Sequence, residues 1–283
     1  MHAGNDSSIQ RVSSESRQFI ALARLELRRH VFGRNAAWLA FLSLAPAMVI
    51  ALHWVSGALR SQHCSIESDS ALFAWVFLVF QLRVAIYFGT LGVFARAFRG
   101  ERNDRTLQYA LMAPLRREWF VTTKYLADAL GCFAWFGAGT ALAWILMAWH
   151  HGGAGLAEAL NAPNLLVLVK YLGICLLACL GYGAVFLALG HAFRNPVLGA
   201  IVFFGWESVS AMLPLGLQLL SVTFYLKPLF PVELPLFGIS GLLTAAIEPL
   251  PTWGAVMGLL LISSLLVTSV AVAFRRVEVD STD

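Results

Sequence analysis

The sequence predicts an all-α membrane protein. We expect six transmembrane helices, an N-terminal amphipathic helix at the membrane interface, and an outer re-entrant helical segment between spans five and six. Hydrophobic residues make up 59% of the chain and charged residues only 13%, whereas about 25% of residues are charged in soluble domains. The mean hydropathy is +0.72. Apolar runs of the roughly 20 residues that cross a bilayer as a helix recur along the chain.

The chain begins with a polar stretch, residues 1–14, which we expect to be a disordered tail. Residues 17–31 follow as a predicted helix with two different faces. The apolar face holds Phe19, Ile20, Ala23, Leu27 and Val31, and the basic face holds Arg17, Arg24 and Arg28. Such a helix suits the inner headgroup layer, with its arginines toward anionic lipid or a cytosolic partner. An ordinary basic juxtamembrane segment is the alternative.

Six apolar runs account for the predicted transmembrane domain, which extends over residues 15–276 and precedes a cytosolic tail at 277–283. The predicted spans are residues 36–59, 71–98, 119–149, 164–192, 197–220 and 253–274. Arginine concentrates in the leader, in the connection between spans two and three, and in the tail. The positive-inside rule therefore places both termini in the cytosol. We expect a multi-pass protein of the plasma membrane, which in a bacterium is the inner membrane.

The connection between spans five and six, about 221–252, is apolar but interrupted by prolines. Its longest apolar run, residues 236–247, has twelve residues, and about 20 are needed to cross a bilayer. A half-helix that dips into the outer leaflet fits this length, provided that protein covers its free backbone groups. A plain folded outer loop is the alternative.

Four charged residues fall inside predicted spans: Arg83, Lys124, Asp128 and Glu207. A lone charge at that depth costs at least about 2.5–3.5 kcal/mol. Arg83 and Glu207 lie at similar distances from the outer ends of their spans, roughly 18–20 Å at 1.5 Å per residue, so we expect them to form a buried ion pair. Asp128 is a rival partner for Arg83, and Lys124 lies one turn before Asp128. These charges serve either packing alone or the lining of a substrate path.

The histidines and the serine motif give no sign of chemistry in this chain. His63 is next to Cys64, and His150 is next to His151, but neither pair has a carboxylate at ligand spacing, so we expect solvated loop histidines. The sequence Gly-Ile-Ser-Gly at 238–241 would suit an intramembrane serine protease, yet no histidine follows it to act as base. We therefore predict no catalytic residue, no metal site and no cofactor-binding site.

The basic stretch between spans two and three is the most informative part of the chain. Residues 99–124 read RGERNDRTLQYALMAPLRREWFVTTK. Asn103 or Asp104 can cap a helix start, and Pro114 disfavours helix at the residue before it. A helix of about two turns is thus predicted between them. Its apolar stripe holds Leu107, Ala110 and Leu111, and its other face holds Arg105, Gln108 and Met112.

At these residues the chain resembles the ABC-2 type family of ABC transporter permeases. That family has a cytoplasmic segment here with a Glu, then Gly-Thr-Leu, a Pro, one or two basic residues, and Gly-Lys before the next span. The matching positions are Glu101, Thr106, Leu107, Pro114, Arg116 or Arg117, and Lys124. Arg105 and Thr123 stand where the family has glycines. In span count and order the resemblance covers roughly residues 15–276, including the amphipathic helix before the first span and the short re-entrant helices before the last.

The resemblance implies a membrane-spanning permease subunit of an ABC transporter, most commonly an exporter. A P-loop would read GxxxxGK[ST], and the sequence has no Gly-Lys pair, so ATP and Mg²⁺ are expected on a separate ATPase subunit. The segment implied to couple to that ATPase comprises Glu101, Arg105, Thr106, Leu107, Gln108, Met112, Pro114, Arg116 and Arg117.

The expected partners are that ATPase, the lipid bilayer, and a second permease copy or a related permease. We expect no nucleic acid, because the formal charge of +4 comes from arginines that flank membrane spans. The alternative from another class is a non-transporting membrane scaffold or assembly factor.

Overall fold

The computed structural model describes residues 21, 23–30, 33, 36–60, 66–95, 117–193, 195–231 and 250–275. In these ranges the fold consists of helices joined by short connections. No strand occurs in these ranges. We call the helical residues 23–30 the N-terminal helix. The larger elements after it are α2 (Ala36–Arg60), α3 (Ile66–Val76), the π-helix η1 (Phe77–Ile86), α4 (Tyr87–Phe94), α7 (Arg117–His150), α8 (Gly152–Ala159), α9 (Ala162–Ala192), α10 (Pro196–Val209) and α14 (Thr252–Arg275). Short turns of helix follow α10: η2 (Ser210–Met212), α11 (Leu215–Gln218), α12 (Val222–Leu226) and η3 (Lys227–Leu229).

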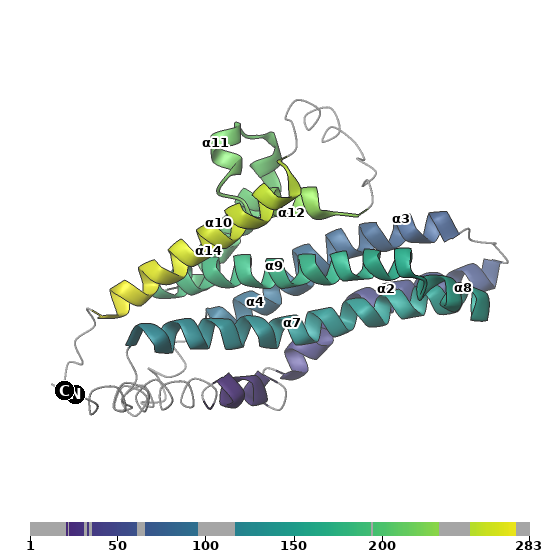
Figure 1. The fold of residues 1–283 in the computed structure, drawn as a ribbon, viewed down its shortest axis with the longest axis horizontal. Coiled ribbons are helices and arrows are strands. Elements are labelled where there is room, and N and C mark those ends of the chain that lie inside the picture. Colours follow the sequence, from purple (N-terminus) through teal and green to yellow (C-terminus); the bar gives the residue numbers. More distant parts are fainter. Residues whose placement is uncertain are drawn as a thin grey trace, which may run out of the picture.

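Five helical stretches among the described residues are long and apolar enough to cross a membrane. Their bounds are Ala36–Ser56, Asp69–Phe94, Trp119–Trp149, Ala162–Ala192 and Thr252–Ala273. They coincide within a few residues with five of the six predicted spans, so the predicted all-α fold with membrane-spanning character is confirmed at this level. In Figure 1 the long helices α2, α7 and α9 run lengthwise beside one another, and α14 crosses them obliquely.

The fifth predicted span, residues 197–220, is wrong as a continuous helix. The helix α10 stops at Val209 after 14 residues. Leu213 is extended, with φ −91° and ψ 159°, because a proline at position 214 disfavours helix at the preceding residue. The chain then continues in the short turns η2, α11, α12 and η3 on one side of the bundle, beside α14 (Figure 1).

The stretch corresponding to span two changes helical type in its middle. The ten residues Phe77–Ile86 form a π-helix between α3 and α4, although π-turns usually occur as single-turn bulges, frequently at functional sites. From inside this π-helix the buried Gln81 donates a hydrogen bond from Nε2 to the backbone oxygen of Phe136 at 2.8 Å. This contact connects the second stretch to α7 at the centre of the bundle.

Close helix packing forms the core, and one glycine shows how close it is. A Cβ atom at Gly139 of α7 would lie 2.1 Å from the backbone oxygen of Ser43 in α2. Nothing larger than hydrogen fits there, so α2 and α7 approach one another along their backbones. Aromatic rings fill the space farther along, where Phe73, Trp144 and Tyr171 pack edge to face and at a tilt.

Candidate functional site

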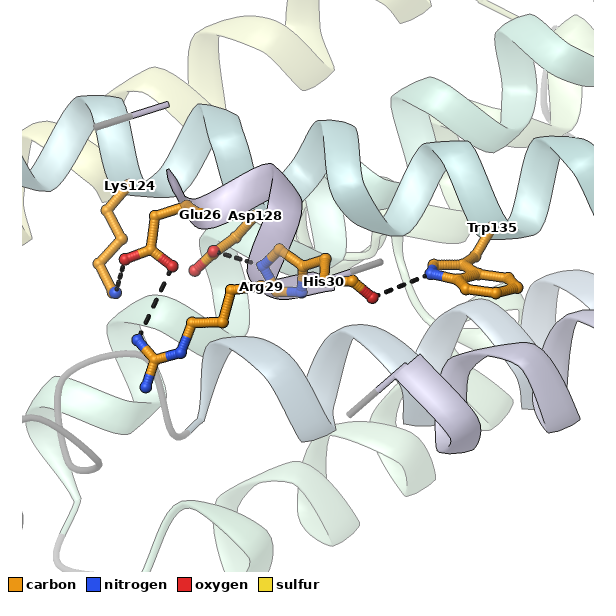
Figure 2. A network of polar contacts seen from close by, with 6 residues as sticks. All are labelled: Glu26, Arg29, His30, Lys124, Asp128 and Trp135. Atoms are coloured by element: carbon orange, nitrogen blue, oxygen red, sulfur yellow. Dashed lines mark hydrogen bonds and ion pairs between the residues drawn. The ribbon is translucent and has the colours of Figure 1, made fainter. Parts of the chain in front are cut away.

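The candidate site is a buried polar network between the N-terminal helix and α7 (Figure 2). Glu26 and His30 lie four residues apart, hence on one face of the N-terminal helix, and Lys124 and Asp128 have the same spacing on α7. The two pairs face each other. Each acidic or basic side chain therefore meets an opposite or hydrogen-bonding partner on the other helix.

The contacts in this network are short and shielded from solvent. The Lys124 ammonium donates to Glu26 Oε1 at 2.8 Å, and His30 Nε2 lies 2.7 Å from Asp128 Oδ1. The four side chains are only 4–7% exposed. Removing one member of such a buried pair leaves its partner without compensation, which typically costs about 3–5 kcal/mol. The network consequently holds the N-terminal helix in one register on α7.

Groups around the network contact both the backbone and the ring of His30. The indole of Trp135 donates to the His30 backbone oxygen at 3.2 Å. A Cβ atom at Gly131 would lie 2.8 Å from His30 Cδ2, so the absence of a side chain there makes room for the ring. Arg29 approaches Glu26 Oε2 at 3.9 Å but is 59% exposed, so solvent screens this contact.

Three members of the network have the donor atoms of a metal site. The ligand atoms of Glu26, His30 and Asp128 lie within 4.8 Å of one another, and all three residues are buried. Carboxylate oxygen and imidazole nitrogen suit several divalent transition metals. The Lys124 ammonium nevertheless holds Glu26, and His30 is bonded to Asp128. Protein groups thus already use these donors, and the arrangement favours docking of the N-terminal helix on α7.

The sequence pattern found only half of this network. Lys124 and Asp128 were predicted as intramembrane polar residues, but Glu26 and His30 were missed because the predicted helix was divided into an apolar and a basic face. Arg24 and Arg28 are exposed, as that division requires, while Arg17 lies outside the described residues. The signal that could have revealed the network is the repeated four-residue spacing, Glu-x₃-His upstream and Lys-x₃-Asp in the third span.

Glu207 is the centre of a second buried polar cluster, at the end of α10. Its carboxylate accepts hydrogen bonds from the backbone N–H groups of Val222 at 2.7 Å and Thr223 at 3.2 Å. Hydroxyl groups also donate to it, from Ser221 at 3.1 Å, Tyr182 at 3.5 Å and Thr223. Glu207 therefore joins three elements, α9, α10 and the start of α12.

The predicted ion pair between Arg83 and Glu207 is not found among the described residues. Arg83 is half-buried in the last turn of the π-helix, whereas hydroxyl and backbone donors fill the acceptor positions of Glu207. Both charges still act on Lys227. The pKa of Lys227 is lowered because the surrounding protein desolvates its ammonium group and Arg83 repels it, and Glu207 opposes the shift.

The break after α10 borders a large apolar cavity of about 690 Å³. Its walls come from α9, α10, α12 and α14. Lining side chains include Val185, Leu189, Phe203, Tyr225 and Leu259. Residues of the short turns that replace the end of the predicted fifth span, and residues of α14, both line this cavity.

A third polar cluster corrects the expectation for one histidine. His151 Nε2 lies 2.9 Å from Asp69 Oδ2, and His53 Nε2 lies 3.9 Å from the other oxygen of Asp69. Asp69 is almost fully buried, so His151 is not simply a solvated loop residue. The carboxylate was missed because it comes from a helix 82 residues earlier in the chain. His63 and Cys64 lie outside the described residues.

Several predicted functional segments also fall outside the described residues. These are the coupling positions from Glu101 to Arg116 and the predicted re-entrant run 236–247. Of the coupling positions, Arg117 is described as the first residue of α7. No family model, curated protein or solved structure matches this chain.

Proposed function

We propose that this chain is the membrane-spanning permease subunit of an ABC transporter, and that it works as an exporter. ATP and Mg²⁺ bind a separate ATPase subunit, which docks on the cytosolic segment around Thr106 to Ala113. A second copy of the chain, or a related permease, completes the transport unit in the lipid bilayer of a bacterial inner membrane. Both termini are cytosolic, with six crossings and a re-entrant segment before α14.

One observation carries this proposal. The helix α7 begins at Arg117, directly after the segment that resembles the coupling segment of ABC-2 permeases. Two turns later, Lys124 and then Asp128 bind the N-terminal helix. A displacement of the coupling segment would therefore move α7 and the N-terminal helix together, as one rigid unit. Such rigid-body transmission is what alternating exposure of a transport path requires.

The broken fifth segment supports the same function. Half-helices and irregular turns at membrane depth are tolerated only where they are buried in protein or line a cavity. Here α10 ends about halfway along the predicted fifth span. Glu207 accepts hydrogen bonds from the first backbone N–H groups of α12, and the apolar cavity borders both elements. An interrupted helix that borders a cavity is a site at which a transporter can change its conformation.

The test is co-purification and ATPase assay with the ATPase encoded beside this gene. We expect Glu101→Ala and Met112→Glu to insert into the membrane at normal levels yet lose ATPase association or transport-linked hydrolysis. From the sequence pattern we expect Glu101 to complement the positive end of a helix in this segment. We expect Met112 to lie on the face of that helix away from the apolar stripe. Glu158→Ala, which removes an exposed carboxylate from α8, serves as the matched control. Normal association and coupling in both variants would rule out the docking role.

A further inference from the structure

Two cations beside the Glu207 cluster have no hydrogen bond or ion pair with any residue that the structure describes. They are Arg83 in the π-helix η1 and Lys227, the first residue of η3. The charges that act on Lys227 are those of Arg83 and Glu207. Hydroxyl and backbone donors already occupy the Glu207 carboxylate. These three groups carry two positive charges and one negative charge, so one positive charge is left over.

Aromatic and hydroxyl contacts bring the segments of the two cations together. Phe230 follows η3 directly and packs on Phe77, the first residue of η1, with ring centroids 5.9 Å apart. Tyr87 follows η1 directly and packs on Tyr182 at 5.3 Å. The Tyr182 hydroxyl in turn lies 3.2 Å from Thr223 Oγ1 in α12, which precedes η3. The two cations are close enough for one to repel the other.

These segments lie near one end of α14, a helix long and apolar enough to cross the membrane. A Cβ atom at Gly258, six residues after the start of α14, would lie 2.6 Å from the ring of Tyr225, which is two residues before Lys227. Leucines between 40% and 63% exposed lie on the turns that lead to α12, namely Leu215, Leu219 and Leu220. Cations next to exposed apolar surface at a membrane boundary are the combination that binds anionic lipid.

We propose that Arg83 and Lys227 together bind the phosphate group of an anionic phospholipid. The planar guanidinium offers two parallel N–H donors to phosphate oxygens, and the ammonium adds a compact second charge. Arg83 is half-buried and Lys227 is exposed, so neither cation is sealed inside the bundle. An unpaired cation in a membrane span is costly, and the phosphate supplies the missing negative charge. The acyl chains of the lipid would cover the apolar surface beside it, which a free anion would not do.

The experiment measures lipid binding to the full-length chain in an uncharged detergent by native mass spectrometry. The probe is phosphatidylglycerol. One parallel titration uses phosphatidylcholine, which has the same phosphate but no net charge, and another adds inorganic phosphate alone. We expect phosphatidylglycerol to bind on the order of tenfold more tightly than phosphatidylcholine, because the site has one surplus positive charge. Inorganic phosphate at the same concentration should not displace the lipid.

Substitutions test the two cations separately. Arg83→Gln and Lys227→Gln should each weaken phosphatidylglycerol binding at least about tenfold, since each removes a charged donor to the phosphate. Arg83→Lys keeps the charge but not the planar fork, so its affinity should fall between those of the parent and Arg83→Gln. Lys170→Gln removes an exposed lysine from α9 and should bind lipid like the parent. Without added lipid, Arg83→Gln should unfold at the parent midpoint or above it.

Four results would overturn the lipid site. They are equal binding of the two phospholipids, displacement of the lipid by inorganic phosphate, an equal loss of affinity in Lys170→Gln, and a lower unfolding midpoint of lipid-free Arg83→Gln. The last result would mean that a group of the chain itself holds the guanidinium. The measurement involves neither ATP nor transport. The lipid site can therefore fail while the transporter function holds, and it can hold if the chain transports nothing.

Discussion

At the scale of single residues, the chain keeps ionised groups inside an apolar bundle in two different ways. Glu26 meets a cation from another helix, the Lys124 ammonium. Glu207 meets neutral donors, two of them backbone N–H groups at the start of α12. Both arrangements satisfy a carboxylate. They differ in what they connect, since the first joins two long helices and the second anchors a short irregular segment.

Glu207→Gln tests the second arrangement. A carboxamide offers one acceptor oxygen, and its NH₂ group would face hydroxyl and N–H donors. Because hydrogen bonds to a charged group contribute about 1.5–3 kcal/mol, we expect stability to fall by that order. The measurement is the midpoint of thermal unfolding in detergent. Ser208→Ala, the next residue on α10 and exposed, is the control and should melt like the parent; an unchanged midpoint for Glu207→Gln would contradict the anchoring role.

Sequence reasoning could place the charges along the chain but could not pair them. Span depth suggested that Arg83 and Glu207 meet, on the assumption of straight α-helices with 1.5 Å per residue. The structure has a π-helix around Arg83 and a helix end two residues after Glu207, so equal counts along the chain do not give neighbouring side chains. Apart from Tyr182 on α9, the partners of Glu207 are residues 221–223, which were predicted to begin the outer loop.

At the scale of elements, hydropathy predicted helices well wherever the backbone allowed one. Spans one to four and six need only an apolar run of sufficient length, and the structure has them within a few residues. Span five had the same apolar character, but the proline at 214 interrupts its backbone. Averaged hydropathy is insensitive to a single residue of this kind. The local rule for the residue before proline points to position 213, but it points equally to position 45, where α2 continues through Pro46. The rule alone therefore does not predict which proline breaks its helix.

The contact between α2 and α7 gives a prediction at this scale. We expect Gly139→Ala to lower the unfolding midpoint clearly, because its methyl group would press on the Ser43 backbone and overpacking costs about 1–3 kcal/mol. The control is Gly173→Ala in α9, where nothing lies within 4 Å of the added Cβ. There the better helix propensity of alanine should leave stability unchanged or slightly raised. Equal effects at both glycines would mean that backbone contact between α2 and α7 is not needed.

At the scale of the whole molecule, the exposed surface is that of a protein in lipid. Large apolar side chains such as Phe41, Leu52 and Trp253 are between 60% and 74% exposed. The described residues include many more large apolar side chains that are exposed in the same way, and such side chains favour a lipid environment over water. The orientation in the membrane rests on arginine distribution and remains a prediction that needs its own measurement.

Labelling of cysteines from one side of the membrane would measure the orientation of the chain. Glu158 in α8 and Asn195 before α10 are exposed and lie at opposite ends of α9, a helix of 31 residues. In the Cys64→Ala background, an impermeant maleimide added to intact cells should label Glu158→Cys and leave Asn195→Cys unlabelled. Permeabilised cells should show both. Labelling of Asn195→Cys alone in intact cells would invert the proposed topology, and the parent background without Cys64 controls for the buried cysteines.

The facing pairs on the N-terminal helix and α7 also limit how this sequence can diverge. A neutral residue at position 26 would leave the Lys124 ammonium buried without its carboxylate. A residue at position 30 that cannot donate a hydrogen bond would leave the Asp128 carboxylate buried without its donor. Each substitution is therefore harmful until the partner position changes too. In sequences descended from a common ancestor with this chain, positions 26 and 124 should therefore vary together, and so should 30 and 128. Position 131 should admit larger residues only where the ring at 30 has been lost. The network would then be readable from covariation alone, without coordinates.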